Sequence, residues 1–176
     1  MNTIRKTVLV TALLTSALWM KTAIAAEPLL HVVVKMHSIE QIQAQEKAGD
    51  ELYMSVTEFG PKTRYYRVPD QPFYWRGDSL QKVKDVELFS VDLEPKQKLS
   101  LVFSLMEQDV APWNPDDLLG AVKADLERTA KGMKETWVMP DKQTVFISDS
   151  AKGEVHPIEF RTKDARYRAQ LSLEFK

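Results

Sequence analysis

Apolar and polar residues alternate repeatedly along this chain, and this spacing leaves few folds open. In the clearest stretch, 99–106, three leucines and Phe103 point one way, while two serines, Val102 and Met106 point the other. Because successive side chains of a strand point to opposite faces, the spacing predicts a strand with one buried face. Comparable stretches are 30–36, 51–59, 63–68, 86–93, 154–160 and 167–175, with short candidates around the turn at Pro140-Asp141.

The connections between these stretches are short, and strands do not alternate with long helical segments. This order predicts an all-β fold, an antiparallel β-sandwich of seven or eight strands.

Two segments have residue patterns that favour helices. The run 38–49 has helical spacing and ends at Gly49, which predicts a short helix. After Gly120, two alternatives stay open: a strand followed by a short helix, or a helix throughout. Pro157 makes 154–160 a predicted edge strand.

The first 25 residues have the parts of a secretory signal peptide. Arg5 and Lys6 precede an uncharged apolar run at 7–20, and Ala23-Ile24-Ala25 has the small residues of a cleavage site. An uncleaved membrane anchor is the alternative, but the run is short for about 30 Å of hydrocarbon and Lys21 interrupts it. We therefore predict a signal peptide at 1–25, a single domain at 26–176, and a periplasmic or secreted location.

Composition excludes several classes of function. The chain has no cysteine, so it has neither disulfides nor thiolate metal sites. It carries 24 basic and 25 acidic residues, and removal of 1–25 takes away Arg5, Lys6 and Lys21. The mature chain then has 21 basic (24 − 3) and 25 acidic side chains, a net charge of −4. Nucleic-acid binding, which needs a basic surface, is not expected.

The alternating stretch 99–106 runs into a segment rich in carboxylates. Glu107, Asp109, Asp116 and Asp117 flank the apolar pair Pro112-Trp113. Calcium prefers six to eight oxygen ligands, and neighbouring carboxylates supply them. The alternative is that these are solvated loop acids that serve as turn or cap residues. Trp113 either contacts a membrane or a partner, or folds back onto the sandwich.

Four short motifs, taken in chain order, resemble the C2-type calcium- and lipid-binding β-sandwich family, which includes synaptotagmin and protein kinase C. They are L-x-V-x-V at 30–34, E-L-Y-M-S-V at 51–56, Glu107-Gln-Asp109, and D-L-L-G at 117–120. The resemblance implies a calcium site formed by Glu51, Glu107, Asp109 and Asp117, with Pro112 and Trp113 as a contact to a membrane or partner. The chain departs from the family pattern at Glu107, where an aspartate is usual, and has no clear counterpart of the family's first aspartate.

Enzyme signatures are missing from the sequence. It has no G-x-S-x-G, no H-E-x-x-H and no phosphate-binding glycine loop, and a serine–histidine–aspartate set would have to come from distant residues. His31, His37 and His156 are expected at the surface, and the first two lie about 20 Å apart along one strand. The expected function is an exported, non-enzymatic interaction module, a subunit of a periplasmic or secreted cell-envelope assembly. The alternative is Ca²⁺-dependent lipid or ligand binding with peripheral membrane contact.

Overall fold

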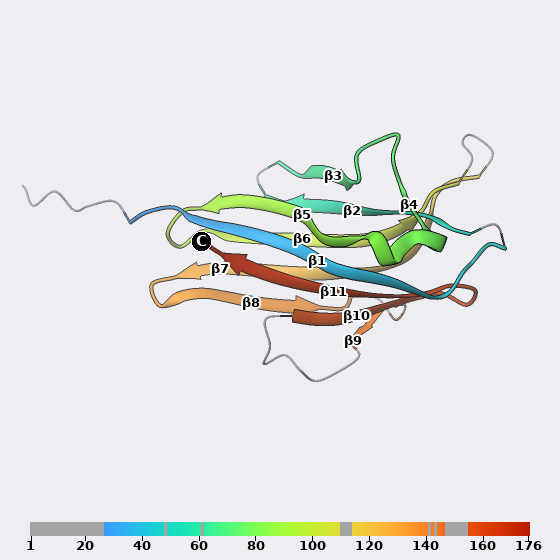
Figure 1. The fold of residues 1–176 in the computed structure, drawn as a ribbon. Coiled ribbons are helices and arrows are strands. Elements are labelled where there is room, and N and C mark those ends of the chain that lie inside the picture. The colour runs from blue at the N-terminus through green and yellow to red at the C-terminus, as the bar shows by residue number, and fades with distance from the viewer. Residues whose placement is uncertain are drawn as a thin grey trace, which may run out of the picture.

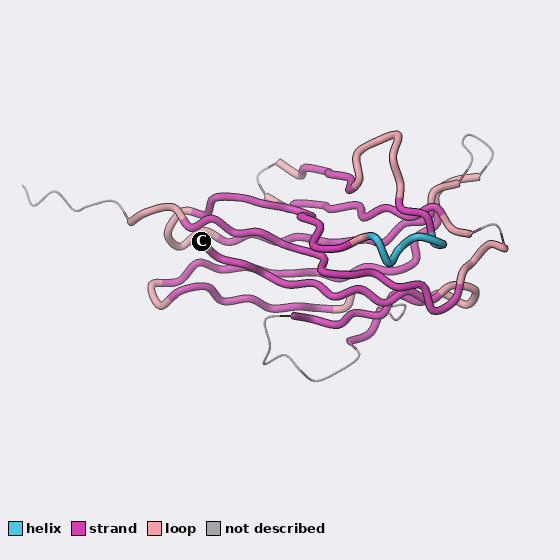
Figure 2. The backbone as a smooth tube through the Cα atoms, viewed as in Figure 1, coloured by secondary structure: helices cyan, strands magenta, loops and turns pink. Residues whose placement is uncertain are grey.

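A computed structural model describes residues 27–47, 49–60, 62–109, 114–140, 142, 144–146 and 155–176. Strands make up most of this part of the chain, and its one helix is a short 3₁₀ segment (Figure 2). The elements are β1 (Leu30–Gln43), β2 (Glu51–Phe59), β3 (Arg64–Val68), β4 (Trp75–Arg76), η1 (Gly77–Lys82), β5 (Lys84–Leu93), β6 (Lys98–Glu107), β7 (Asp117–Thr129), β8 (Gly132–Val138), β9 (Thr144–Phe146), β10 (Val155–Arg161) and β11 (Arg166–Phe175).

The strands form two antiparallel sheets that pack face to face (Figure 1). The first sheet has the order β5-β1-β11-β10-β9. The second sheet has the order β3-β2-β6-β7-β8, and β4 pairs with β2. The predicted all-β, antiparallel sandwich is therefore confirmed, although the described residues form eleven strands rather than seven or eight.

One apolar core lies between the sheets. The inward-facing residues of β6 are the predicted ones, Leu99, Leu101, Phe103 and Leu105, and all four are buried. They pack with inward-facing residues of β1 and β11 in the other sheet, which form part of the same cluster. Burial of such a side chain stabilises the fold by about 1.5–3 kcal/mol, and a chain without disulfides depends on this core.

The predicted helix at 38–49 is wrong, and so is the helix in either alternative after Gly120, although the strand with which one alternative began is confirmed. The segment 38–43 continues β1, which pairs with β11 as far as Gln43 through two register shifts. The segment 117–129 is a single strand, β7, which pairs with β6 on one side and β8 on the other. Pairing along the whole strand outweighs the helical propensity of its alanine, lysine, glutamate and arginine residues.

The predicted edge position of Pro157 needs a correction. The strand β10 lies between β11 and β9, so it is not the edge of the first sheet. However, β9 pairs only with Ile158–Phe160, and Pro157 lies just outside that pairing. Since proline has no N–H to donate to a neighbouring strand, a position outside the described pairing with β9 suits it.

In the part of the chain that the structure describes, no helix is long and apolar enough to cross a membrane. The predicted signal peptide and the Pro112-Trp113 pair both lie outside the described residues.

Candidate functional site

Three connections meet at one end of the sandwich, opposite the end where the chain terminates (Figure 1). The Gly77 N–H at the start of η1 donates to the Asp50 carbonyl before β2, at 2.8 Å. The Gln108 N–H after β6 donates to the Glu51 carbonyl at 2.7 Å. The Gln45 side chain, between β1 and β2, donates to Asp117 at 2.6 Å. We call this surface the acidic end, because most of its ionisable side chains are carboxylates.

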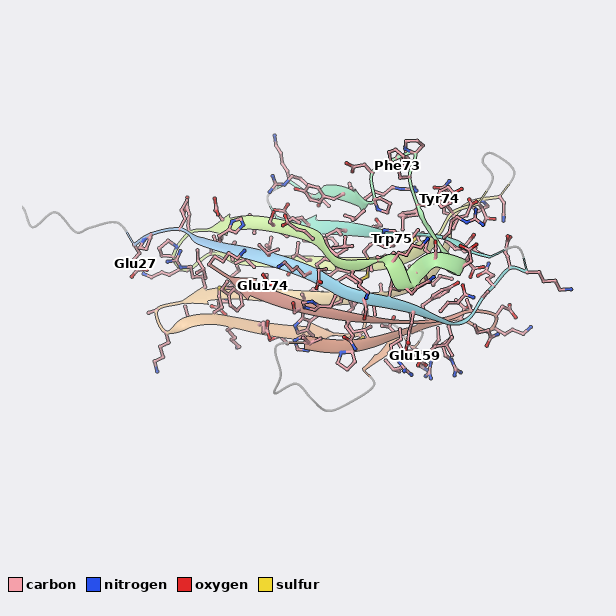
Figure 3. The ribbon with its side chains drawn as sticks, in the orientation of Figure 1. Glu27, Phe73, Tyr74, Trp75, Glu159 and Glu174 are labelled. Atoms are coloured by element: carbon pink, nitrogen blue, oxygen red, sulfur yellow. The ribbon has the colours of Figure 1, made fainter. Side chains whose placement is uncertain are left out.

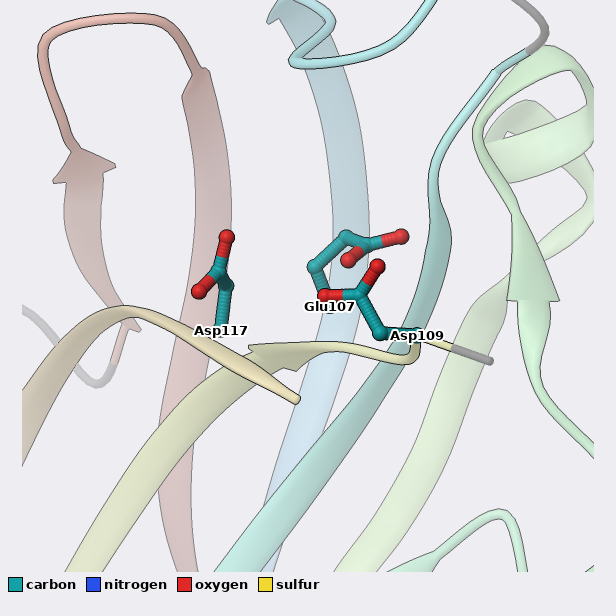
Figure 4. Close-up of side chains that lie close together, drawn as sticks. All are labelled: Glu107, Asp109 and Asp117. Atoms are coloured by element: carbon teal, nitrogen blue, oxygen red, sulfur yellow. The ribbon is translucent and has the colours of Figure 1, made fainter. Parts of the chain in front are cut away.

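Glu107, Asp109 and Asp117 come together at the acidic end (Figure 4). One carboxylate oxygen from each lies within 4.8 Å of the others. Glu107 is the last residue of β6 and pairs with Asp117, the first residue of β7, while Asp109 follows β6. The antiparallel pairing of two strands therefore places these acids side by side.

Glu107 is a strand residue rather than the loop residue that the sequence suggested. It occupies the inward-facing position after Leu105, and it is only 2% exposed. Its Oε2 has no hydrogen-bond partner among the described residues, and the same holds for the buried Oδ2 of Asp109. Burying a carboxylate oxygen without a hydrogen-bond partner is costly, so these two oxygens are the unusual feature of this surface.

Burial and neighbouring charges act strongly on Glu107. The pKa of its carboxyl is raised to about 8, chiefly by burial and next by the negative charge of Asp109. The charges of Glu46 and Asp50 contribute to this rise, while a backbone hydrogen bond from Glu51 opposes it. A cation placed among these oxygens would relieve the repulsion that raises this pKa.

Asp50 is also buried, at 1% exposure, but it is well satisfied. Its carboxylate accepts hydrogen bonds from the N–H of Gln45 at 2.8 Å, the N–H of Glu46 at 2.7 Å, and the hydroxyl of Tyr167. Burial, followed by this contact with Asp50, raises the pKa of Tyr167 well above its usual range. Asp50 therefore shapes the β1–β2 connection and joins it to β11.

A cavity of about 220 Å³ opens at the acidic end. Its acidic lining residues are Glu46, Asp50, Glu51, Asp78, Glu107 and Asp109. Among the described residues that line it, the one basic residue is Arg76, which pairs with Asp78 at 3.0 Å. An opening with this charge favours a cation or a basic group over an anion.

Glu51, the fourth predicted ligand, is not in the group of three carboxylates. It lines the same cavity, but its side chain accepts a hydrogen bond from the Tyr74 hydroxyl, which raises the pKa of Tyr74. Asp116 has structural partners as well: it accepts hydrogen bonds from the Tyr53 hydroxyl at 2.7 Å and from the Asp109 N–H at 3.2 Å. Sequence reasoning did not propose Glu46 or Asp78 as part of this surface.

Phe73 and Tyr74 precede β4, and Trp75 is its first residue; these three aromatic residues have different surroundings (Figure 3). Phe73 is 67% exposed and projects from the loop, and Tyr74 is exposed as well. Trp75 packs against the core. The Phe73 carbonyl accepts a hydrogen bond from Arg67 at 3.1 Å, and Arg67 also bonds the side chain of Gln108. This exposed phenylalanine therefore lies on a loop that is tied to the acidic end.

The three histidines have separate surroundings. His31 lies at the surface, 2.7 Å from Asp92. His156, expected at the surface, is buried, because it shares the inward-facing side of β10 with Ile158. Its ring packs at a tilt against the Trp137 ring, with the ring centroids 4.8 Å apart. That prediction is wrong.

His37 joins three strands of the first sheet. Its Nδ1 lies 2.8 Å from Asp85 Oδ1 on β5, and its Nε2 lies 2.7 Å from Ser172 Oγ on β11. The order of groups is that of a catalytic triad, but Ser172 lies in the interior of the sheet and is only 3% exposed. A nucleophile must reach its substrate, so we interpret this chain of hydrogen bonds as a link between β5, β1 and β11.

Comparison with models of known protein families found no match, and no curated protein matches this chain.

Proposed function

We propose that this protein is an exported, non-enzymatic binding module, and that it contacts a cell-envelope or secreted partner through its acidic end. The support for this proposal is a set of features that occur together at the acidic end. The buried Asp50 and Glu107 line an open cavity of about 220 Å³, and the exposed Phe73 lies on a loop that Arg67 ties to Gln108 in the same lining. Binding residues are commonly carried on loops that a rigid scaffold holds in place.

One observation favours a calcium-dependent form of this function, and it carries the proposal. Glu107 is buried and its Oε2 has no partner among the described residues, while Asp109 and Asp117 each bring an oxygen within 4.8 Å of it. Hard carboxylate oxygens in a flexible group suit Ca²⁺, and water would complete its six to eight ligands. The residues present therefore fit a calcium ion, held by Glu107, Asp109 and Asp117, with Glu51 nearby on the cavity wall.

A calcium site at this end would agree with the resemblance to C2-type sandwiches. The bound ion would then also have a role in binding a partner. We propose that the bound ion attracts anionic groups to the acidic end, where Pro112, Trp113 and the exposed Phe73 would meet a membrane or a partner. The expected affinity is that of extracellular calcium modules, with a dissociation constant on the order of 10⁻⁴–10⁻³ M.

Replacement of Asp109 by asparagine tests the proposed ion. In thermal melts of the mature chain, about 10 mM calcium should raise the Tm of the wild type by roughly 3–10 °C relative to chelator, since an ion that binds only the folded state stabilises it. Asp109→Asn should lose this rise, because one charged ligand is gone.

Asp92→Asn is the matched control. Asp92 is an exposed aspartate that pairs with His31 on the outer side of the first sheet, outside the acidic end. This variant should keep the full calcium effect. A calcium-induced rise that persists in Asp109→Asn would overturn the assignment, whereas an equal loss in both variants would show a nonspecific effect of charge.

A further inference from the structure

Another cavity lies where the chain passes from the second sheet to the first. The strand β4 pairs with β2 in the second sheet, while β5 pairs with β1 in the first sheet. The short helix η1 joins β4 to β5 (Figure 1). Beside this crossing is a cavity of about 410 Å³, which we call the edge cavity. Its lining residues are Tyr74, Trp75, Arg76, Ser79, Lys82, Val83, Lys84 and Val86.

The inner wall of the edge cavity is apolar. Trp75, Val83 and Val86 are partly buried and pack against the core. Tyr74 adds a ring whose hydroxyl is held by Glu51. Sites for small molecules have volumes of about 300–1,000 Å³, mostly apolar walls and a few polar groups that orient the ligand. The edge cavity has this size and this kind of wall.

The charged side chains of the edge cavity all have the same sign. Arg76, Lys82 and Lys84 are exposed, and the described residues that line the cavity include no carboxylate. Neither lysine forms an ion pair with a described residue, and the pair of Arg76 with Asp78 is open to solvent on both sides. Such a pair contributes little stability, so Arg76 can exchange its partner. The edge cavity therefore favours an anion.

The alternation of β5 keeps its acidic side chains away from this cavity. Lys84 and Val86 line the cavity, and successive side chains of a strand point to opposite faces. Asp85 lies on the outward face of the first sheet, 2.8 Å from His37 Nδ1. Glu87 follows on that same face. The strand thus presents its lysine to the cavity and its acids to the other side.

We propose that the edge cavity binds a small organic carboxylate, whose apolar body lies against the inner wall and whose charged group meets the three cations. The Arg76 guanidinium already holds one carboxylate at this place, that of Asp78, at 3.0 Å. A guanidinium matches the planar geometry of a carboxylate, and the two lysines add compact positive charges. Both parts of such a ligand therefore find a matching surface.

The arrangement of the lining favours a free molecule over a membrane lipid. The apolar residues pack against the core, whereas the cations are exposed at the rim. A ligand must therefore enter with its apolar part first and leave its charge outermost. A lipid in a bilayer keeps its apolar chains in the hydrocarbon layer and presents its charged group first, which is the opposite order.

The edge cavity is distinct from the proposed calcium site. Glu107, Asp109 and Asp117 are not among its lining residues. Experiments in chelator therefore test the edge cavity alone, and their result does not depend on whether the acidic end binds calcium.

NMR titration of the mature chain with octanoate in chelator tests this site. Octanoate joins a carboxylate to an alkyl chain, and it should bind with a dissociation constant on the order of 10⁻⁴–10⁻³ M. The signals of Trp75, Val83 and Val86 should shift most. Acetate lacks the chain and octanol lacks the charge, so each should bind at least about tenfold more weakly.

Two sets of substitutions should change the affinity for octanoate in opposite directions. Lys82→Gln combined with Lys84→Gln removes two cations at exposed positions and should raise the dissociation constant at least about tenfold. Asp78→Asn releases Arg76 from its partner and should lower the dissociation constant roughly two- to threefold.

Lys131→Gln combined with Lys134→Gln is the matched control. It removes the same charge at exposed positions in and beside β8, at the opposite end of the sandwich from η1 (Figure 1). It should bind octanoate like the wild type. Octanoate that binds the Lys82/Lys84 variant as tightly as the wild type would overturn the proposal, as would equal weakening in the control. So would octanol that binds as tightly as octanoate, or shifts confined to residues outside the edge cavity.

Discussion

Glu107→Gln is expected to stabilise the calcium-free protein, although it removes a buried charged group. At pH 7 the folded protein must either keep a proton on Glu107 or bury its charge, whereas the unfolded chain ionises it freely. With a folded pKa of about 8 against an ordinary 4.5, the cost at pH 7 has an upper limit of about 3 kcal/mol. Glutamine fills the same space without this cost, and its amide N–H can donate to Asp109.

Urea unfolding in chelator measures the effect. We expect a gain of about 1–3 kcal/mol for Glu107→Gln. The same variant should lose the calcium-induced rise in Tm, so that stability and binding change in opposite directions. Glu127→Gln, a surface glutamate paired with Lys98, is the control and should stay within about 0.5 kcal/mol of the wild type. A Glu107→Gln protein less stable than wild type would show that the charge on this residue is satisfied in the fold.

The pH dependence of stability follows from the same residue. Its pKa is raised on folding, so its contribution to stability is fully present below about pH 4.5 and is lost as the pH rises to about 8. The free energy of unfolding of the wild type should therefore fall relative to that of Glu107→Gln between pH 4.5 and pH 8. The difference should level off outside this window.

Asp50→Ala should be among the most destabilising single changes at the acidic end. It removes the acceptor of three hydrogen bonds and leaves the Tyr167 hydroxyl and two backbone N–H groups without their partner. Hydrogen bonds to a charged group contribute about 1.5–3 kcal/mol each, and the effects are not additive, so we expect a loss of about 3–5 kcal/mol. Chemical unfolding at neutral pH measures it.

Tyr167→Phe is the matched variant, because it removes one of the three bonds and keeps the buried ring. It should cost about 1–2 kcal/mol. If Asp50→Ala cost no more than Tyr167→Phe, the bonds to Gln45 and Glu46 would contribute little, and the β1–β2 connection would be held by other contacts.

The strands were predictable where alternation was strict, and less so where polar residues filled the outward face. In the stretch 99–106, the alternation of apolar and polar residues alone was enough to predict a strand, and the buried face of that strand is the expected one. The segments 38–43 and 117–129 were predicted as wholly or partly helical from local residue spacing. Local spacing cannot show that a neighbouring strand is available to pair with the segment. Local propensity yields to such pairing, which brings together residues far apart in the sequence.

The acidic end was predictable only in part, because the predicted ligand Glu51 lies outside the group of three carboxylates and Glu46 and Asp78 were not proposed. Glu107, Asp109 and Asp117 were expected together, and the structure brings them together. The expectation treated Glu107 as a loop residue, although it continues the inward series Leu101, Phe103 and Leu105. A carboxylate in that series was the signal for a buried acid. Asp50 carries the same signal, since it precedes the inward-facing Leu52 and Met54 by the same spacing.

Titration calorimetry of the mature chain with calcium, in buffer freed of divalent ions, tests the central claim most directly. We predict a saturable binding heat with a dissociation constant on the order of 10⁻⁴–10⁻³ M. Glu107→Gln and Asp109→Asn should abolish this heat, and Asp92→Asn should keep it. A wild type that shows no heat at calcium concentrations of about 10 mM, or one whose heat survives both substitutions at the acidic end, would contradict the assignment of this surface as a calcium site.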